Sequence, residues 1–436
     1  MSTLPAAAAA LHPRAWFALA VLLLVYLMNF LDRTLIYVLF PLIKAELHFS
    51  DLQLALLGST SFVIFYTSLG VPFGRLADRA SRRKLIAAGL ITWSIFSGLT
   101  GFATDFWTLF GCRLMVGVGE ATLGPAAMSL LSDLFPQSRR ATAQSVYSAG
   151  IPLGAAAAFF LGSQIGAEWG WRAAFLYLGF PGVVLAVLVM ALPEPQRGAT
   201  ERAQAGPSAS VAPLSQNHAF LRMIFAYAVF AVAANCLSIW VPSLLGRLRG
   251  VPLPTIGALA GFGMLIGGGL GTLLGGAAAD AVRKRHPGGR LLFTAGLAAA
   301  SVPLWLVMLH SSSLPVLAVT YTLLAAVGLA WLGPAAAEVH DLAGPSRRGL
   351  AIAVYFLVVN LVGYGLAPPA IGWLSDRLGG AADPAQLAVA LLVAPACCAA
   401  AAVMLAVEGR RRGRAVAQAR RATVGQESRV GRLELG

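Results

Sequence analysis

Four charged residues stand inside apolar stretches of this sequence. Arg113 and Glu120 lie in RLMVGVGEATLGPAA, and Asp32 and Arg33 lie in MNFLDRTLIYVLF. A formal charge at bilayer depth costs roughly 2.5–3.5 kcal/mol on insertion scales, so it survives where it faces a partner or a water-filled cavity. The pattern therefore predicts a polar site that is shared by two helices and contains two carboxylates and two guanidiniums.

The spacing of these charges indicates how they would pair. Arg113 and Glu120 are about two helical turns apart, a rise of roughly 10 Å, so they share nearly one face at different depths. They are too far apart for the contact that residues four apart make, and each needs another partner. Asp32 and Arg33 sit at comparable depth in the first apolar segment and are the nearest candidates.

A polar stripe surrounds the first pair of charges. Tyr26, Asn29, Arg33 and Tyr37 follow one another at steps of three and four residues, which places them on one helix face, and Asp32 borders that face. We expect these side chains to bind a ligand or to form part of a gate.

Such a site can couple a proton to an anion. Low dielectric raises the pKa of a carboxyl group in general, and a nearby guanidinium lowers it. Arginine stays charged and binds phosphate or carboxylate through two hydrogen bonds. An anion that competes for Arg33 or Arg113 would leave a displaced carboxylate easier to protonate. We interpret Asp32 and Glu120 as proton carriers and Arg113 as an anion-binding or gating charge; the alternative is a pair of salt bridges that only lock two helices together.

The rest of the chain must supply membrane-spanning helices to position these residues. Of 436 residues 58% are hydrophobic and 11% charged, and the mean hydropathy is +0.75, which is the composition of a membrane protein. Twelve apolar segments are long enough to span a bilayer. They cover about 16–40, 52–76, 84–103, 106–131, 141–166, 172–192, 220–246, 254–279, 290–310, 314–337, 348–374 and 386–407.

The spans form two halves that repeat each other. SDLFPQSRRATAQSVY begins at Ser132 and HDLAGPSRRGLAIAVY begins at His340, each between the fourth and fifth span of its half, with eight identical residues at a constant offset. Six spans per half make the two halves run the same way through the membrane, an arrangement associated with alternating access. The predicted division is a six-helix bundle over 1–192, a cytoplasmic linker over 193–217, a second bundle over 218–408 and a basic tail over 409–436.

The net charge of +14 serves membrane topology rather than nucleic-acid binding. Lysines and arginines gather in alternate loops and in the tail, and the other loops hold only Lys44, Arg172, Arg247, Arg249 and Arg377. The positive-inside rule then places both termini in the cytoplasm. The basic tail could bind anionic lipid or RNA, and we favour the lipid surface.

Two loops carry a glycine-to-aspartate spacing that occurs twice. GRLADRASRRK begins at Gly74, and GGAAADAVRKR, which contains Asp280, ends at Arg285. Asp78 or Asp280 can neutralise nearby arginines or meet a helix N-terminus and so hold the cytoplasmic side shut; a plain topology signal is the alternative. The predicted cytoplasmic gate comprises Gly74, Asp78, Arg79, Arg82, Arg83, Asp133, Arg139, Arg140, Asp280, Asp341 and Arg347.

Small residues recur every four positions in the fifth and eighth spans. Because small residues let helices approach closely, we expect both spans at the seam between the halves. The repeats are Gly150, Gly154, Ala158, Gly162 and Gly166, and Gly263, Gly267, Gly271 and Gly275.

The second half has no charges at mid-membrane to match those of the first. Its polar groups there include Asn235 in the seventh span and Asn360 and Tyr364 in the eleventh, which we include as substrate-binding or gating candidates. A space with one charged wall and one apolar wall suits an amphipathic anion. No histidine lies at mid-membrane, and neither the histidines nor the cysteines have the spacing of a metal site.

These motifs resemble a known family. GRLADRASRRK is similar to the signature of the major facilitator superfamily, and Arg113 falls where that superfamily places an arginine in its fourth helix. More narrowly, NFLDR at Asn29, the run FYTSLGVPFGRLADRASRRK and RLMVGVGEA at Arg113 are similar to the spinster (Spns) transporters, as are IPLG, LPEPQRGATER, LSIWVP and PPAIGWLSDRL further on. The resemblance spans about 16–405. It implies export of lysolipids or sphingosine phosphate, linked to protons, with matching residues at Asp32, Arg33, Arg113 and Glu120.

The sequence as a whole predicts an all-α membrane protein with the major facilitator fold and no enzymatic activity. We expect a proton-coupled secondary transporter that works by alternating access, as a monomer without cofactors, in the plasma membrane, which would be a bacterial inner membrane. The expected cargo is an amphipathic anion such as a lysophospholipid; the alternative is a multidrug or organic-anion carrier. A lipid sensor and a scramblase stay open as other classes. A nucleotide-driven pump is disfavoured because no GxxxxGK[ST] occurs, and an intramembrane enzyme because no nucleophile with a base is apparent.

Overall fold

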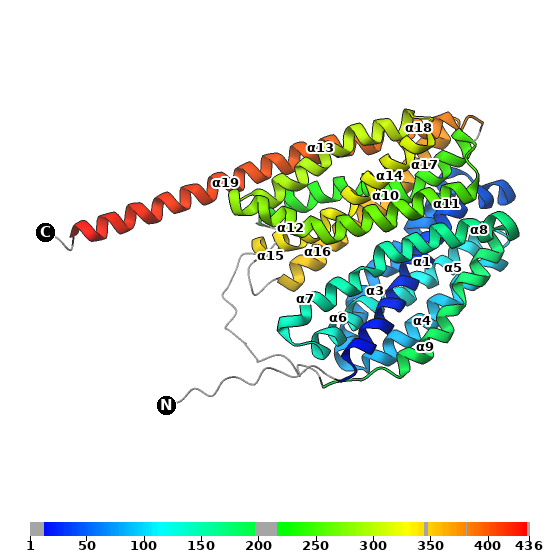
Figure 1. Cartoon of the computed structure of the whole chain (residues 1–436), viewed down its shortest axis with the longest axis horizontal. Helices are drawn as coiled ribbons and strands as arrows, with labels where there is room; N and C mark the ends of the chain where they lie inside the picture. Colours follow the sequence, from blue (N-terminus) through cyan, green and yellow to red (C-terminus); the bar gives the residue numbers. More distant parts are fainter. Residues whose placement is uncertain (1–12, 197–215, 344–347, 381, 434–436) are drawn as a thin grey trace.

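The computed structural model describes residues 13–196, 216–343, 348–380 and 382–433, and every regular element in them is a helix. Figure 1 shows two helical bundles, one made of α1 to α9 and the other of α10 to α19. Each bundle is a half of the chain, as the internal repeat predicts. Most of the expected linker lies outside the described residues.

The first half consists of nine helices and two short helical segments that together make six spans. Several spans contain more than one element because the helix changes geometry or breaks partway. The elements are α1 (Ala15–Leu47), α2 (Asp51–Ala55), η1 (Leu56–Thr60), α3 (Ser61–Arg79), α4 (Arg82–Leu99), η2 (Thr100–Phe102), α5 (Phe106–Glu120), α6 (Leu123–Leu134), α7 (Gln137–Ser148), α8 (Gly150–Gly179) and α9 (Pro181–Met190).

The second half has the same organisation. Its last helix runs far beyond the bundle, so the basic tail continues the twelfth span as a helix (Figure 1). The elements are α10 (His218–Arg249), α11 (Leu253–Phe262), η4 (Gly263–Gly268), α12 (Gly269–Arg285), α13 (Gly289–His310), α14 (Leu314–Ala330), α15 (Leu332–Ala343), α16 (Arg348–Asn360), η6 (Leu361–Leu366), α17 (Ala367–Arg377), α18 (Ala385–Ala390) and α19 (Val393–Leu433).

The number of spans agrees with the sequence prediction. By length and hydropathy, 11 segments of the described chain are able to cross a membrane, and one of them, Ser138–Met190, is 53 residues long. Gly170 interrupts this segment with φ +83°, a backbone conformation that glycine adopts at little cost. The segment is therefore two spans, the fifth and the sixth, and the total is twelve.

Within the described residues, three spans contain a π-helical segment. These segments are η1 in the second span, η4 in the eighth and η6 in the eleventh. A π-segment holds one more residue per turn than an α-helix and is common at functional sites. Nothing in the apolar periodicity predicts them.

The fifth and eighth spans lie at the seam between the halves, as expected, but most of their repeating glycines pack against helices of their own half. A Cβ on Gly267, Gly271 or Gly275 would lie 2.0–2.2 Å from backbone oxygens of α14 in the same half. In the fifth span, a Cβ on Gly154 would lie 2.3 Å from the Leu27 carbonyl oxygen of α1, and Gly150 and Gly162 face side chains of α1. The two spans do meet at the seam, where α8 packs against α11, but the close approach there is at Gly257, whose Cβ would meet Ser163.

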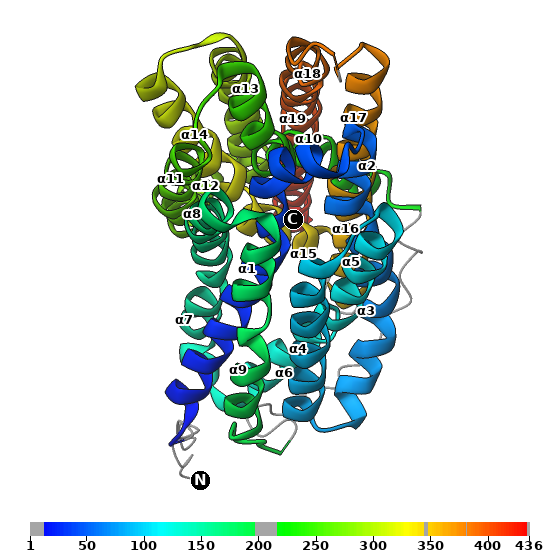
Figure 2. The same cartoon turned by 90° about the vertical axis from the view of Figure 1, so that its right-hand side faces the viewer.

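The two halves hold each other at the end opposite the chain termini. There α2 packs against α17, η1 against η6, and α1 against α10. Figure 2, viewed from that end, shows α2 crossing from the first half to lie beside α17. At the other end, no substantial packing joins α6 or α7 to α15 or α16 within the described part of the chain. The structure is therefore closed at one end only.

The glycine packing yields a stability prediction. Gly271→Ala would drive a methyl group into the Ala326 carbonyl, and overpacking of this kind costs about 1–3 kcal/mol, so we expect a lower melting temperature in detergent. Gly269→Ala is the matched control, because a Cβ there meets nothing within 4 Å. Equal melting temperatures for the two variants would contradict the close contact between α12 and α14.

Candidate functional site

An ion pair between the first and fourth spans forms the centre of the candidate site. Arg33 of α1 donates from Nη2 to Glu120 Oε2 at 2.8 Å. The Glu120 side chain is fully buried, whereas 14% of the Arg33 side chain is exposed. The sequence did not determine which acid pairs with which arginine. In the structure, the ion pair forms between Arg33 and Glu120.

Aromatic rings hold the Arg33 guanidinium in place. Its carbon lies 4.2 Å from the ring centroid of Phe62, 4.9 Å from that of Phe30 and 5.0 Å from that of Tyr66. The faces of these rings attract a cation, and they also exclude water from it. Arg33 is therefore held by one carboxylate and three aromatic rings, and its Nε has no hydrogen-bond partner among the described residues.

The other two charges interact without forming an ion pair. Asp32 accepts a hydrogen bond from the Ser97 hydroxyl at 2.6 Å, and Arg113 donates to the Asp32 backbone carbonyl at 3.2 Å. Both side chains are buried. Arg113 makes no ion pair with any described residue, so the structure brings all four predicted charges together but joins only two of them directly.

Several polar atoms at this centre have no hydrogen-bond partner among the described residues. They are Asp32 Oδ2, Glu120 Oε1, Arg33 Nε, and Arg113 Nε and Nη2. Buried polar groups are nearly always satisfied in folded proteins, so such a concentration of exceptions calls for water, a proton or a ligand. The centre therefore has free acceptors for protons and free donors for an anion.

The polar stripe of the first span divides into two parts. Towards the chain termini, Tyr26 stacks on Tyr147 of the fifth span with centroids 4.2 Å apart, and Asn29 is buried. Towards the closed end, the Tyr37 hydroxyl donates to the Gly58 carbonyl at 2.9 Å and contacts the Tyr364 hydroxyl of the other half. The stripe thus leads from the charged centre to the contact between halves.

The π-segments make that contact. Thr60 of η1 donates to the Gly365 carbonyl of η6 at 2.7 Å, and Asn235 donates to the Gly363 carbonyl at 3.1 Å. Asn235 therefore joins two helices of the second half. Asn360 bonds only the Phe356 carbonyl of its own helix among described residues.

Sequence reasoning missed the polar network that closes the end opposite the termini. Asp51 is buried and accepts from Arg247 Nη1 at 2.8 Å, from the Ser375 hydroxyl at 2.7 Å and from Lys44. Arg247 and Ser375 belong to the second half. We call Lys44, Asp51, Arg247, Ser375 and Asp376 the latch.

Local sequence explains why the latch forms at α2. Ser50 and Gln53 make a reciprocal capping box that starts the helix at Asp51. The first backbone N–H groups of a helix lack partners within it. Here those of Asp51 and Leu52 donate to the carboxylate of Asp376 at 2.9 and 2.8 Å. The SDLQ pattern at Ser50 was the available sequence signal, and it predicts where the helix starts. It does not indicate that Asp51 is buried, because a charge at the end of a span is usually solvated.

At the end that holds the termini, arginines fasten each half internally. Arg82 is fully buried and pairs with Asp133 and with Glu194, the latter at 2.9 Å. Burial favours a raised pKa for the Glu194 carboxyl, but hydrogen bonds from Ser81 and Arg82 outweigh it and lower the pKa. The corresponding residue of the second half, Arg290, pairs with Asp341 at 3.0 Å and with Asp280 at 2.7 Å.

The other predicted gate residues vary in their surroundings. Arg83 donates to the Leu192 carbonyl at 3.2 Å, and Arg140 to the Ser132 carbonyl at 3.0 Å. Asp78, Arg79 and Arg139 are exposed, and a Cβ on Gly74 would meet no atom within 4 Å. Arg347 lies outside the described residues.

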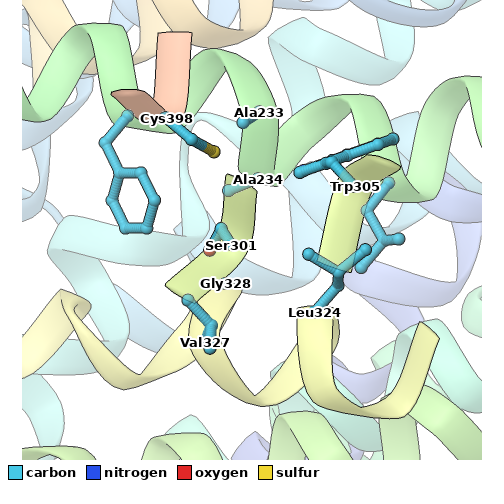
Figure 3. Close-up of a pocket in the computed structure, with 10 residues that line it drawn as sticks. Ala233, Ala234, Ser301, Trp305, Leu324, Val327, Gly328 and Cys398 are labelled. Carbon is cyan, nitrogen blue, oxygen red and sulfur yellow. The ribbon is translucent and has the colours of Figure 1, made fainter. Parts of the chain in front are cut away.

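The second half contributes an apolar interior. Figure 3 shows a cavity between α10, α13, α14 and α19 whose lining includes Ala233, Ser301, Trp305, Leu324 and Cys398. Its volume is about 10 Å³, which is space for roughly one water molecule. A hydrocarbon chain therefore does not fit here in this conformation and would have to lie along helix faces.

The fold and the site define a class. Two parallel six-helix halves, closed at one end and carrying buried charges between the first and fourth spans, are those of a secondary membrane transporter. The family model of the Major Facilitator Superfamily matches residues 22–363, and the chain belongs to that superfamily.

Within the superfamily the chain is a member of the spinster family. Spinster homolog 1 of Bos taurus is 30% identical over 388 residues, which are 82% of this chain and 72% of that protein. Spinster homolog 1 of Homo sapiens is 29% identical over 393 residues, covering 84% and 74%. An MFS-type efflux pump of Mycolicibacterium smegmatis is 31% identical over 390 residues, covering 87% and 89%. The solved structure of a bacterial homolog of the human lysosomal transporter spinster, inward-facing and occupied, matches with TM-score 0.74 and 24% identity over 92% of this chain and 96% of that one.

The latch yields a prediction about conformation. Asp51→Asn removes the charge that Arg247 and Lys44 face, and the loss of one member of a buried ion pair costs about 3–5 kcal/mol. We expect the halves to separate more often at this end. The measurement is the distance distribution between spin labels at Trp107→Cys and Leu314→Cys, with the native cysteines replaced, and the population at longer distances should grow.

Asp105→Asn is the matched control for this measurement. Asp105 is an exposed carboxylate at the same end, but it caps α5 within the first half and makes no bond to the second half among described residues. If both variants give the distribution of the parent protein, the latch does not hold the halves together.

Proposed function

We propose that this transporter is a proton-coupled exporter of amphipathic anions, of which a lysophospholipid is the model substrate. The observation that carries the proposal is the state of Glu120. This carboxylate is fully buried, holds Arg33 through one oxygen and has no hydrogen-bond partner among described residues at the other. It is placed to exchange one partner for another.

The coupling follows from competition for Arg33. A phosphate or carboxylate headgroup forks onto the planar guanidinium better than a single carboxylate oxygen does. When it displaces Glu120, the released carboxylate stands in an apolar setting without its cation, and the protonated, neutral form is then favoured. The anion and the proton are therefore linked, because both act on the pairing of Glu120 with Arg33.

Arg113 and Asp32 provide further groups for the same exchange of partners. The unpartnered Nη2 of Arg113 supplies a second donor for an anion, and the free oxygen of Asp32 supplies a second proton acceptor. The Ser97 hydroxyl donates to the other oxygen of the Asp32 carboxylate. We propose that both acids carry protons and that Arg113 acts as the gating charge.

The amphipathic nature of the cargo rests on the contrast between the two halves. In the first half four charged groups meet between the spans, whereas the described acids and bases of the second half lie towards helix ends, for example Arg222, Arg247, Asp376 and Glu408. An anion with a hydrocarbon part finds a headgroup partner on one side and an apolar surface on the other. A preference for sugars in transport assays would contradict this substrate class.

The positions of the basic loops suggest the orientation. If the positive-inside rule holds, the end with the termini faces the cytoplasm, and the latch faces the opposite side. The described conformation, closed at the latch, would then be inward-facing. Cargo would enter from the cytoplasm or from the inner leaflet and leave when the latch opens.

A drug or organic-anion carrier is the second candidate. The efflux pump of M. smegmatis, at 31% identity, favours it. The same ion pair would serve such a substrate, so the two proposals differ in cargo and not in coupling.

Glu120→Gln tests the coupling. Transport of labelled lysophosphatidic acid is measured in proteoliposomes with an imposed pH gradient and, separately, as exchange without a gradient. We expect the variant to lose most of the dependence on the gradient while it retains exchange, because glutamine can still bond Arg33 but cannot take up a proton.

Glu168→Gln is the control, because Glu168 is an exposed acid outside the site. It should behave as the parent protein does. If Glu120→Gln follows the gradient as the parent does, Glu120 is structural and the proposal must move to Asp32 or be abandoned.

A further inference from the structure

A pocket of about 500 Å³ lies in the second half, on the same end as the latch. It is formed where α10 ends and α11 begins, and where the α13–α14 connection returns. Its lining residues include Arg249, Thr255, Ser312, Leu314 and Leu317, and none of the lining residues is acidic. The transport site described above uses none of them.

Arg249 is positioned in this pocket without a carboxylate. Its Nη1 donates to the Ser312 hydroxyl oxygen at 2.5 Å and its Nη2 to the Leu309 carbonyl at 2.7 Å. Its Nε is buried and has no partner among described residues. Both recorded partners are neutral, so no carboxylate of the described residues offsets the charge of this guanidinium.

Two helix N-termini open at the same pocket. α11 begins at Leu253 and α14 at Leu314, and both carry proline at the second position. No backbone bond from the Leu253, Thr255, Leu314 or Val316 N–H occurs among the described turns and caps. Free N–H groups and the positive ends of two helix dipoles favour an anion. Together with an unpaired arginine, they make the pocket electropositive.

The depth of the pocket indicates which anion it meets. Arg249 is the last residue of one membrane-spanning helix and Leu314 the first of another, so the pocket lies at the level of lipid headgroups. Leu314 and Val316, 40% and 41% exposed, add an apolar surface beside it. A ligand with a phosphate group and a hydrocarbon part matches both features.

We propose that this pocket binds a phosphate-type anion, and specifically the headgroup of an anionic phospholipid of the leaflet that faces the latch. The phosphate lies against Arg249 and the first N–H groups of α11 and α14, and its acyl chains lie along Leu314 and Val316. Because Arg247 of the latch is two residues away on α10, a lipid held here braces the helix end that the latch uses. The proposal goes beyond transport and does not depend on the cargo.

The test measures local hydrogen exchange, because the basic end of the molecule also attracts anionic lipid. Purified protein in neutral detergent receives dioleoyl phosphatidylglycerol, dioleoyl phosphatidylcholine or inorganic phosphate, and exchange is followed in peptides that cover 250–256 and 312–318. At lipid about ten times its Kd, exchange that requires release of the lipid slows roughly tenfold. We expect this protection from phosphatidylglycerol and not from phosphatidylcholine.

Variants assign the protection to the pocket. Arg249→Gln should abolish it, and Arg249→Lys, which keeps the charge, should retain part of it and guards against a folding defect in the glutamine variant. Arg377→Gln is the matched control, since Arg377 is an exposed arginine at the same end that contacts only the Trp373 ring among described residues. Protection by inorganic phosphate as strong as that by phosphatidylglycerol would support an anion site but assign it to soluble anions. Protection that is absent with both, or that survives Arg249→Gln unchanged, overturns the proposal.

Discussion

Every charge that this chain buries between its helices has to be neutralised there, and the degree to which that happens differs along the molecule. At the latch, Asp51 is surrounded by two cations and a hydroxyl. At the other end, Arg82 bonds two carboxylates, a serine hydroxyl and two backbone carbonyls. At the centre, Glu120 has a single bond, to Arg33, within the described chain. The least satisfied charges are the ones that can change partner at low cost, and they lie midway between two well-satisfied ends.

The internal repeat explains why each half behaves as a unit. Arg82 with Asp133 and Arg290 with Asp341 are the same interaction in the two halves, and each joins helices of its own half only. The second half adds Arg412 of α19, which binds Glu338 at the end of the tenth span. The contacts between halves are concentrated instead at the latch and the π-segments. We therefore expect the two halves to move relative to each other more easily than helices move within one half.

Sequence predicted the features that rest on repetition and on rare residues. The twelve spans follow from apolar run length, the two halves from the recurrence around Ser132 and His340, and the meeting of charges from the first and fourth spans from the cost of a lone charge in a membrane. It did not predict the latch, because Asp51 and Arg247 lie at span ends where a charge needs no explanation. It placed the fifth and eighth spans at the seam correctly, but most of their glycine stripes face helices of their own half, since a stripe shows that a helix is approached closely and does not say by which neighbour.

The π-segments have a consequence for how the spans present their side chains. One additional residue in a turn rotates everything beyond it by about 100° relative to a continuous α-helix. In the second and eleventh spans, η1 and η6 thus separate two faces: the helix beyond η1 towards Asp51 faces the other half, while α3 on its other side packs against α5 in its own half. The chain changes the partner of a helix partway along its length without breaking it. Conversion of such a segment to a regular α-helix would turn one end of the span away from its present neighbour. The two ends of a span are therefore able to respond to different partners although they belong to one continuous helix.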